Sequence, residues 1–200
     1  YRALQETAKD CASTLFTVLL SAFFLLLRFI GGTEDITIGV PVHGRNHSNL
    51  KRVVGMFVQM LPIRIRTGGC KESREVIEIL HQHMRNVYTH MNFDMDMLVS
   101  SLNNVNIYRP QIDTVFVMQD AEELTLADVG LDIQPYLLKK KSVRNKLVME
   151  VIENKNTSLD IHLDYQLQYF SEKTADQLLK QYIDFLRRLF SHPDTQLSEF

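Results

Sequence analysis

The chain has only two cysteines, Cys11 and Cys70, among its 200 residues. Two cysteines cannot supply the disulfide framework on which many small secreted domains depend, so the sequence indicates a reducing, cytoplasmic setting. An excess of one charge is also missing, because 22 basic and 24 acidic side chains leave a net charge of −2. A nucleic-acid-binding surface normally brings a basic excess, so no nucleic-acid partner is predicted.

No hydrophobic run is long enough to predict a membrane partner. Residues 15–27 are nearly all apolar, but Arg28 closes the run after 13 residues, whereas a membrane-spanning helix needs about 20. The run has neither the basic start nor the small-residue cleavage site of a secretory signal. It therefore predicts a buried core helix, which begins at an N-cap at Ser13 and ends at Gly31 and Gly32.

The motifs of a self-sufficient active site are absent too. The chain has no G-x-S-x-G nucleophile elbow, no Walker A loop, no G-x-G-x-x-G and no C-x-x-C. His43 and His47 have the i, i+4 spacing of helical metal ligands, but the turn formers around them favour a solvated loop, so no metal is predicted. His90 and Asp94 fit an H-x-x-x-D pattern found in acyltransferases, although a structural histidine at a helix-to-loop junction fits the same two positions.

What the chain does contain is an alternation of helices and strands. Residues 159–167 alternate between apolar and polar, which predicts a strand with one buried face, and residues 146–153 are its expected hairpin partner. Pro62 places a strand over residues 57–66 at a sheet edge or a bulge. The other expected elements are strands over residues 36–42 and 115–118, helices over residues 72–88 and 95–102, and a last helix capped by Ser171. Together they predict an α/β fold, a two-layer sandwich of a mixed β-sheet with helices packed on one face.

Two consecutive segments carry a family resemblance. Residues 38–45 (IGVPVHGR), followed by residues 54–64 (VGMFVQMLPIR), resemble condensation domains of nonribosomal peptide synthetases in content and order. Residues 90–96 (HMNFDMD) and Pro110 fall where that family has further motifs, and the resemblance covers essentially the whole chain. It assigns these residues to the substrate tunnel or to the family motifs: Gly55, Phe57, Gln59, Met60, Arg64, His90 and Pro110.

The resemblance implies that residues 1–200 form the C-terminal subdomain, the second of two similar lobes with a chloramphenicol acetyltransferase-like fold. Tyr1 opens on a helical pattern without an initiator Met, which suggests a piece of a longer polypeptide. The catalytic H-H-x-x-x-D-G motif of the family belongs to the first lobe and does not occur here, so no catalytic residue is expected in this chain. Residues 120–146 are the expected segment that crosses over to the first lobe.

The function that the resemblance implies is peptide-bond formation in nonribosomal peptide synthesis, the route to many antibiotics. This lobe would form one wall of a tunnel into which peptidyl carrier proteins deliver phosphopantetheine arms, one with a donor thioester and one with an acceptor amine. The expected partners are the N-terminal lobe, the carrier proteins and an adjacent adenylation domain, and no cofactor is expected to bind this chain directly. An isolated lobe should expose the apolar surface that faces its partner.

Departures from the family pattern keep other functions open. Gln59 and Met60 stand where the family usually has Asn-Thr, and Lys146 stands where an acidic residue often begins a strand. If Lys146 removes an ion pair, either a compensating acid exists or the activity is lost, and the chain would then be a non-catalytic module that docks carrier proteins or neighbouring domains. A stand-alone acetyltransferase would need a C-terminal catalytic histidine, which the sequence does not show. Gln59 is the favoured polar tunnel residue, and Arg64 is expected to make a buried hydrogen-bonded contact.

Overall fold

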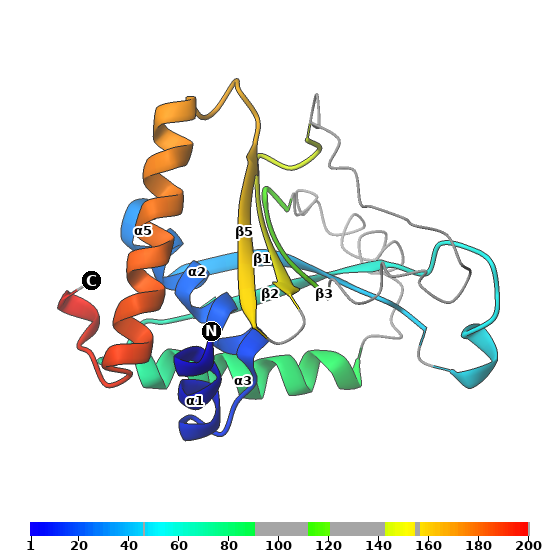
Figure 1. Cartoon of the computed structure of the whole chain (residues 1–200), viewed down its shortest axis with the longest axis horizontal. Helices are drawn as coiled ribbons and strands as arrows, with labels where there is room; N and C mark the ends of the chain where they lie inside the picture. The colour runs from blue at the N-terminus through cyan, green and yellow to red at the C-terminus, as the bar shows by residue number, and fades with distance from the viewer. Residues whose placement is uncertain (46, 91–111, 121–142, 155–156, 200) are drawn as a thin grey trace, which may run out of the picture.

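The computed structural model describes residues 1–45, 47–90, 112–120, 143–154 and 157–199 (Figure 1). In chain order, its helices and strands are α1 (Arg2–Asp10), α2 (Leu15–Gly31), β1 (Asp35–Val42), β2 (Gln59–Arg66), α3 (Ser73–Thr89), β3 (Thr114–Asp120), β4 (Leu147–Asn154), β5 (Ser158–Tyr165) and α5 (Glu172–Ser191). Short 3-10 helices cover Ser48–Leu50 and Leu197–Glu199.

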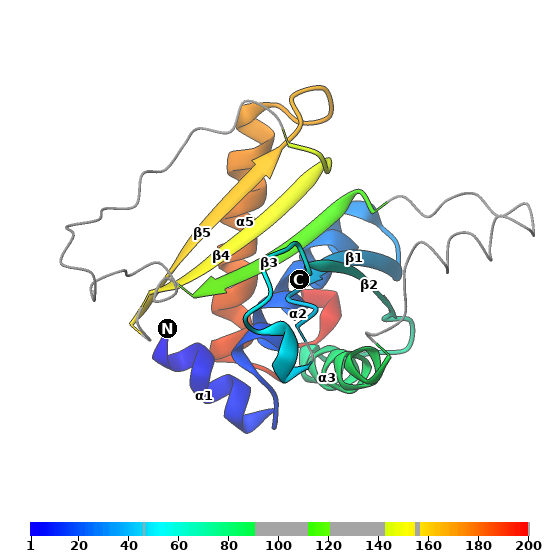
Figure 2. The ribbon, with the colours of Figure 1, turned by 90° about the vertical axis from the view of Figure 1, so that its right-hand side faces the viewer.

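The strands form one mixed sheet in the order β2-β1-β3-β4-β5. The outer pairs β1–β2 and β4–β5 are antiparallel, whereas β3 runs parallel to both of its neighbours. Helices α2, α3 and α5 lie against one face of this sheet (Figures 1 and 2). The predicted α/β sandwich is therefore confirmed. The position of β2 at the edge explains how a strand accommodates Pro62, because an edge strand has one side without a pairing partner.

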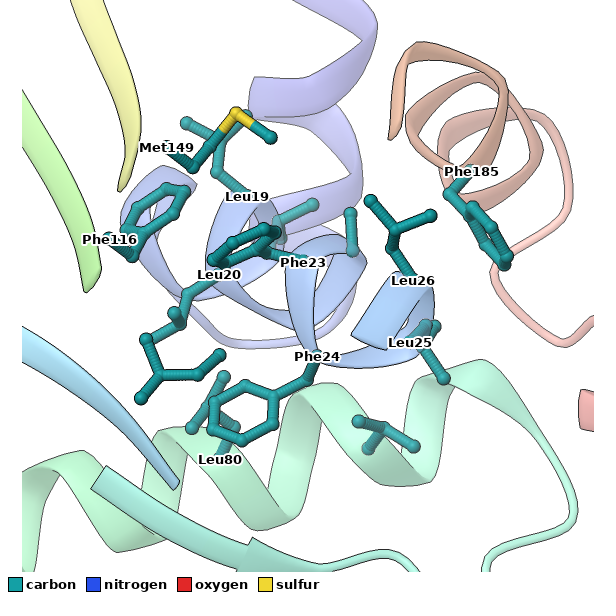
Figure 3. Packing of buried hydrophobic residues seen from close by; sticks show 14 of the residues in the cluster. Leu19, Leu20, Phe23, Phe24, Leu25, Leu26, Leu80, Phe116, Met149 and Phe185 are labelled. Carbon is teal, nitrogen blue, oxygen red and sulfur yellow. The ribbon is translucent and has the colours of Figure 1, made fainter. Parts of the chain in front are cut away.

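Helix α2 is the centre of the core. All ten residues from Thr17 to Leu26 are buried, because a helix that is apolar on every side must be covered on every side. Phe23 packs between Phe116 of β3 and Tyr182 of α5, with ring centroids 5.9 and 6.1 Å away. Figure 3 shows α2 enclosed by side chains from the strands, from α3 and from α5. The burial predicted for the apolar run is confirmed.

The start of α2 differs by one residue from the prediction. Thr14, not Ser13, is the N-cap, and its hydroxyl accepts a hydrogen bond from the Thr17 N–H at 3.2 Å. Ser13 Oγ instead lies 3.2 Å from His81 Nδ1 of α3. Two adjacent hydroxyl residues are equally good caps by sequence, so the tertiary contact decides between them. At the other end Gly32 has a φ of +58°, the left-handed conformation predicted for this stop.

The late hairpin is confirmed, with one correction. Strands β4 and β5 pair along their whole lengths, from Leu147 opposite Tyr165 to Asn154 opposite Ser158. Leu167 was expected to continue the buried face, but the strand ends at Tyr165 and Leu167 is 81% exposed. The chain turns there, where the N–H of Tyr169 donates to the carbonyl of Gln166 at 3.0 Å. The helix expected over residues 95–102 lies outside the described residues.

In the described part of the chain, no helix taken singly has the length and apolar character needed to cross a membrane. Helices α1 and α2 meet that test only as a pair, and the chain bends by 93° between them.

Candidate functional site

The carboxyl ends of three parallel strands meet at one edge of the sheet. Strands β1, β3 and β4 run in the same direction and end at Val42, Asp120 and Asn154. In open α/β sheets, ligands bind outside the carboxyl ends of the strands, where connections leave the sheet. The connection from β1 to β2, residues 43–58, starts at this edge (Figure 2).

Strands β1 and β3 separate as they approach this edge. They share a single register pair, Gly39 with Val115, whereas β3 pairs with β4 from Thr114 to Asp120. A Cβ on Gly39 would lie 2.5 Å from Ile112 Cγ2 and 2.9 Å from Met60 Sδ, so only glycine permits the close approach. Two residues later the chain has Pro41. Because proline has no N–H, this position has no backbone donor that would lose its ladder partner where the strands separate.

A cavity of about 590 Å³ occupies this separation. Its wall contains both consecutive residues of β1, Pro41 and Val42, and the four residues of β3 from Val117 to Asp120. Since successive strand residues point to opposite faces of a sheet, a wall of this kind runs between the strands and not over one face. The remaining lining residues are Phe16, His43, Val58 and Glu153.

One end of the cavity is acidic. Asp120 and Glu153 are register partners on the neighbouring strands β3 and β4. The hydroxyl of Tyr1 donates to Glu153 Oε1, and the Gln5 amide donates to the same hydroxyl. The hydrogen bond to Glu153 raises the pKa of Tyr1 to about 12, with burial and the negative charges of Glu153 and Asp120 acting in the same direction. The raised pKa reflects the Tyr1 hydroxyl donating its proton to a carboxylate beside a second carboxylate.

The loop of residues 43–58 is organised by Arg45. Its Nη1 donates to the carbonyls of Leu50 and, at 2.8 Å, of Val53, while its Nη2 donates to the carbonyl of Gly55 at 3.0 Å. The guanidinium also lies 4.3 Å from the ring centroid of Phe57. A planar guanidinium with several donors suits this combination of forked hydrogen bonds and stacking. Arg45 therefore fixes the path of the loop through contacts with the loop's own backbone and with Phe57.

The same loop presents an apolar surface to solvent. Val54 is 100% and Met56 is 91% exposed, and Val53 and Val58 are about half exposed. Scattered single apolar residues are ordinary on protein surfaces, but four within six residues form a contiguous patch. We call Val53, Val54, Met56 and Val58 the loop patch. It borders the cavity, because Val58 belongs to both.

Four of the residues assigned from the sequence lie in this loop or just after it. Gly55 and Phe57 belong to the loop held by Arg45. Gln59 and Met60 open β2, opposite Val42 and Pro41 of the cavity wall. The Gln59 Oε1 atom is buried and has no hydrogen-bond partner among the described residues.

The other assigned residues lie elsewhere. Arg64 is paired with Asp35 at the far end of the β1–β2 ladder, with two N–O distances of 2.7 Å. Its side chain is 58% exposed, so the expected contact is hydrogen-bonded but not buried. His90 ends α3, where its Nδ1 lies 2.8 Å from the Asn86 carbonyl oxygen. Pro110 lies outside the described residues, as does most of the expected 120–146 crossover segment.

Lys146 has its compensating acid within the same chain. Its Nζ lies 2.7 Å from Asp113 Oδ2, and 4.9 Å from the ring centroid of Tyr169. The charge that the sequence comparison placed against another lobe is therefore paired locally.

Sequence reasoning missed most of the cavity wall. Val117, Gln119, Asp120 and Glu153 have no motif and lie far from residues 43–58 in sequence. Their position on strands was partly predicted, but the sheet order was not. The rule that sites form at the carboxyl ends of parallel strands would have selected them only once that order was known.

A model of the family described as "Condensation domain" matches residues 1–200. Among known sequences, the chain is 32% identical over 200 residues to tyrocidine synthase 3 of Brevibacillus parabrevis. It is 30% identical over 200 residues to bacitracin synthase 3 of Bacillus licheniformis. Each match covers 99% of this chain but only 3% of the relative, so the chain spans a small part of these synthases.

Solved structures share the fold at lower sequence identity. A four-domain nonribosomal peptide synthetase bound to AMP and glycine matches with a TM-score of 0.86 and 21% identity, over 100% of this chain and 16% of that one. The condensation domain of the monacolin K polyketide synthase matches with a TM-score of 0.83 and 16% identity, over 98% of this chain and 45% of that one. The X-domain from teicoplanin biosynthesis matches with a TM-score of 0.84 and 16% identity, over 99% of this chain and 46% of that one.

Proposed function

Because the chain belongs to the condensation-domain family over all of residues 1–200, we propose that it is the C-terminal lobe of a domain that forms peptide bonds in nonribosomal peptide synthesis. It would work together with an N-terminal lobe, which would carry the catalytic histidine motif. The lengths support this division, since the chain matches 45 to 46% of two solved relatives of this fold.

The observation that carries the proposal is the loop patch beside the cavity. Arg45 holds residues 50–57 in one path, yet the apolar side chains of Val54 and Met56 are left in water. Exposed apolar patches on an ordered scaffold mark surfaces that another protein surface covers. The proposed cover is the N-terminal lobe, so that the cavity and the loop become one wall of a tunnel between the lobes.

The role of such a wall is to hold two reactants in one geometry. A donor thioester and an acceptor amine would arrive on phosphopantetheine arms of two carrier proteins, and the amine would attack the thioester carbonyl to give the peptide bond and a free thiol. Holding both reactants replaces a bimolecular encounter with an oriented reaction, an effect that supplies about 7–11 kcal/mol in the best cases. This lobe would contribute that positioning without a general base of its own. An adenylation domain next to it, in a cytoplasmic synthetase, completes the proposed setting.

Association of the two lobes tests the patch directly. The chain is to be mixed with the N-terminal lobe encoded in the same reading frame, and the dissociation constant measured by sedimentation. Met56→Asp should weaken association at least tenfold, because the charge would have to be buried at the interface. Leu167→Asp is the matched control, since Leu167 is 81% exposed but lies outside the loop patch. Equal affinity of both variants would show that the loop patch is not part of the interface between the lobes.

Sequencing the reading frame upstream of Tyr1 distinguishes peptide-bond formation from a non-catalytic docking function. An intact H-H-x-x-x-D-G motif there supports the condensing domain. An eroded motif would leave a module that only docks carrier proteins or neighbouring domains.

A further inference from the structure

We propose that the C-terminal end of α2 carries a docking site for an extended segment of a partner protein, which inserts one apolar side chain and gives a backbone carbonyl to Arg28. The 3-10 helix Leu197–Glu199 borders this site and lies at the opposite side of the molecule from the loop of residues 43–58 (Figure 1). Docking at this surface therefore goes beyond the proposed function, which concerns the edge of the sheet beside that loop.

A buried donor without an acceptor marks the site. Arg28 Nη1 is buried and has no hydrogen-bond partner among the described residues. The other terminal nitrogen of the same guanidinium, Nη2, donates to Glu34 Oε1 at 3.0 Å. Buried donors in proteins are nearly always paired, so an unpaired one points to an acceptor that another molecule supplies.

A small cavity lies beside this donor. Leu25, Arg28 and Phe29 of α2 line it together with Leu197, and its volume is about 170 Å³. This volume is below the usual range of small-molecule sites, about 300–1,000 Å³, so the cavity suits one side chain of a larger partner better than a whole ligand. Because the other three lining residues are apolar, the side chain that gains most from entering is apolar as well.

The charges around Arg28 favour a neutral acceptor over an anion. The guanidinium is already paired with Glu34. It also belongs to the last turn of α2, where the helix dipole places partial negative charge. A carboxylate in the cavity would meet both of these negative charges. A backbone carbonyl satisfies the Nη1 donor without adding charge, and an extended polypeptide presents such carbonyls beside its side chains.

Both walls of the cavity are held in place by the chain itself. The N–H of Leu197 donates to the Lys71 carbonyl at 2.7 Å, which ties the 3-10 helix to the residues before α3. Phe29 is 56% exposed, and its ring centroid lies 6.0 Å from that of Phe185. A partner segment would therefore cover an exposed aromatic ring without having to order the site first, which lowers the entropic cost of binding.

Methyl-resolved NMR of the 200-residue chain tests the site with three probes. N-acetyl-Gly-Leu-Gly-amide carries an apolar side chain and neutral carbonyls, N-acetyl-Gly-Ser-Gly-amide lacks the apolar side chain, and isocaproate carries the branched chain with a carboxylate. The leucine peptide should shift the methyl signals of Leu25 and Leu197 to a saturating value. The other two probes should bind about tenfold more weakly, because each lacks one of the two interactions.

The variant Arg28→Lys tests whether the unpaired donor takes part in binding. Lysine keeps a positive charge opposite Glu34 but has no second nitrogen to present to the cavity. The variant should therefore bind the leucine peptide about tenfold more weakly than the unmodified chain. Arg66→Lys is the matched control and should bind unchanged, because Arg66 is also paired with a carboxylate but does not line the cavity.

The variant Phe29→Ala keeps the test decisive if Arg28→Lys does not fold. Loss of the ring should weaken binding of the leucine peptide about fivefold, because less apolar surface would be covered. Ile30→Ala is its control and should bind unchanged. Phe29 and Ile30 are adjacent and exposed by 56% and 44%, but only Phe29 lines the cavity.

The docking site is overturned if the leucine peptide gives no saturable shift at Leu25 and Leu197, or if the serine peptide or isocaproate binds as well. It is also overturned if Arg28→Lys binds as tightly as Arg66→Lys. Sedimentation of the unmodified chain tests a second copy as the occupant. A dimer that Arg28→Lys dissociates would replace the partner protein with self-association.

Discussion

The guanidinium of Arg45 lies 4.3 Å from the ring centroid of Phe57 and donates to three backbone carbonyls of the same loop. One side chain therefore ties together the first and last parts of residues 45–57. This contact explains how a loop with an exposed apolar patch keeps a defined shape beside the cavity. It also makes the shape of the loop testable by single substitutions.

Arg45→Ala should lower the free energy of unfolding by about 1–2 kcal/mol, because the stacking contact and the charged hydrogen bonds are lost together. Limited proteolysis should cut the loop of residues 43–58 faster in this variant. Arg45→Lys should restore little, since an ammonium cannot reproduce the forked geometry. Arg52→Ala, at an exposed arginine of the same loop, is the control and should behave like the unmodified chain. Equal cleavage of all variants would show that Arg45 does not fix the loop.

Gly39→Ala should destabilise the chain by roughly 1–3 kcal/mol, as overpacking does in a closed site. The new methyl group would lie 2.5 Å from Ile112 Cγ2 and 2.9 Å from Met60 Sδ. Urea unfolding followed by circular dichroism measures the loss. Gly31→Ala serves as the control, because its Cβ would meet Thr33 Cγ2 at an ordinary 3.5 Å. A stable Gly39→Ala chain would mean that β1 and β3 do not approach as closely as described.

Asp35 should make the acid stability of the chain depend on pH. Hydrogen bonds from Arg64, reinforced by Arg66, lower the pKa of Asp35 from 3.8 to about 2. A carboxyl with a lowered folded-state pKa contributes stability above the unfolded pKa, and the contribution is lost as pH falls through the folded value. The contribution is therefore complete above about pH 4 and disappears toward pH 2. Urea midpoints between pH 2 and 5 should fall less steeply for Asp35→Asn than for the exposed control Asp176→Asn. Parallel curves would contradict the ion pair.

Gln59→Ala should lower transfer by the intact domain about tenfold while changing the free energy of unfolding by less than about 1 kcal/mol. The amide oxygen is buried without a partner among the described residues, so its removal forfeits no hydrogen bond seen there. Single-turnover transfer and urea unfolding are to be measured on the same preparations. Gln168→Ala, whose amide contacts Gln166 in an exposed turn, is the control. Proportional losses of transfer and stability would make Gln59 a structural residue.

Much of the fold could be predicted because its signals are local. The uninterrupted apolar run of α2 required burial on all sides. The alternation in β5 predicted a strand with one buried face, and in the structure that face is half-buried. Pro62 indicated an edge strand or a bulge without any knowledge of the neighbours, and the structure shows the edge strand. In each case the pattern of a single segment contains the physical cause of its structure.

The candidate site could be predicted only in part because its signals are not local. Gln59 and Met60 were selected through a resemblance, and they do lie opposite the wall residues Val42 and Pro41. The opposite wall depends on β3 lying between β1 and β4, an order that no single segment specifies. The partner of Arg64 is 29 positions away, and nothing in the pattern of β2 shows whether that contact is buried.

We propose that this lobe completes a condensing domain and does not act alone. The direct measurement is single-turnover transfer from an aminoacylated donor carrier protein to an aminoacylated acceptor carrier protein, followed by mass spectrometry of the acceptor arm. A dipeptidyl product is expected when the chain is joined to its N-terminal lobe, and none with either lobe by itself. Transfer by one lobe alone, or no transfer by the joined lobes with an intact H-H-x-x-x-D-G motif, would contradict it.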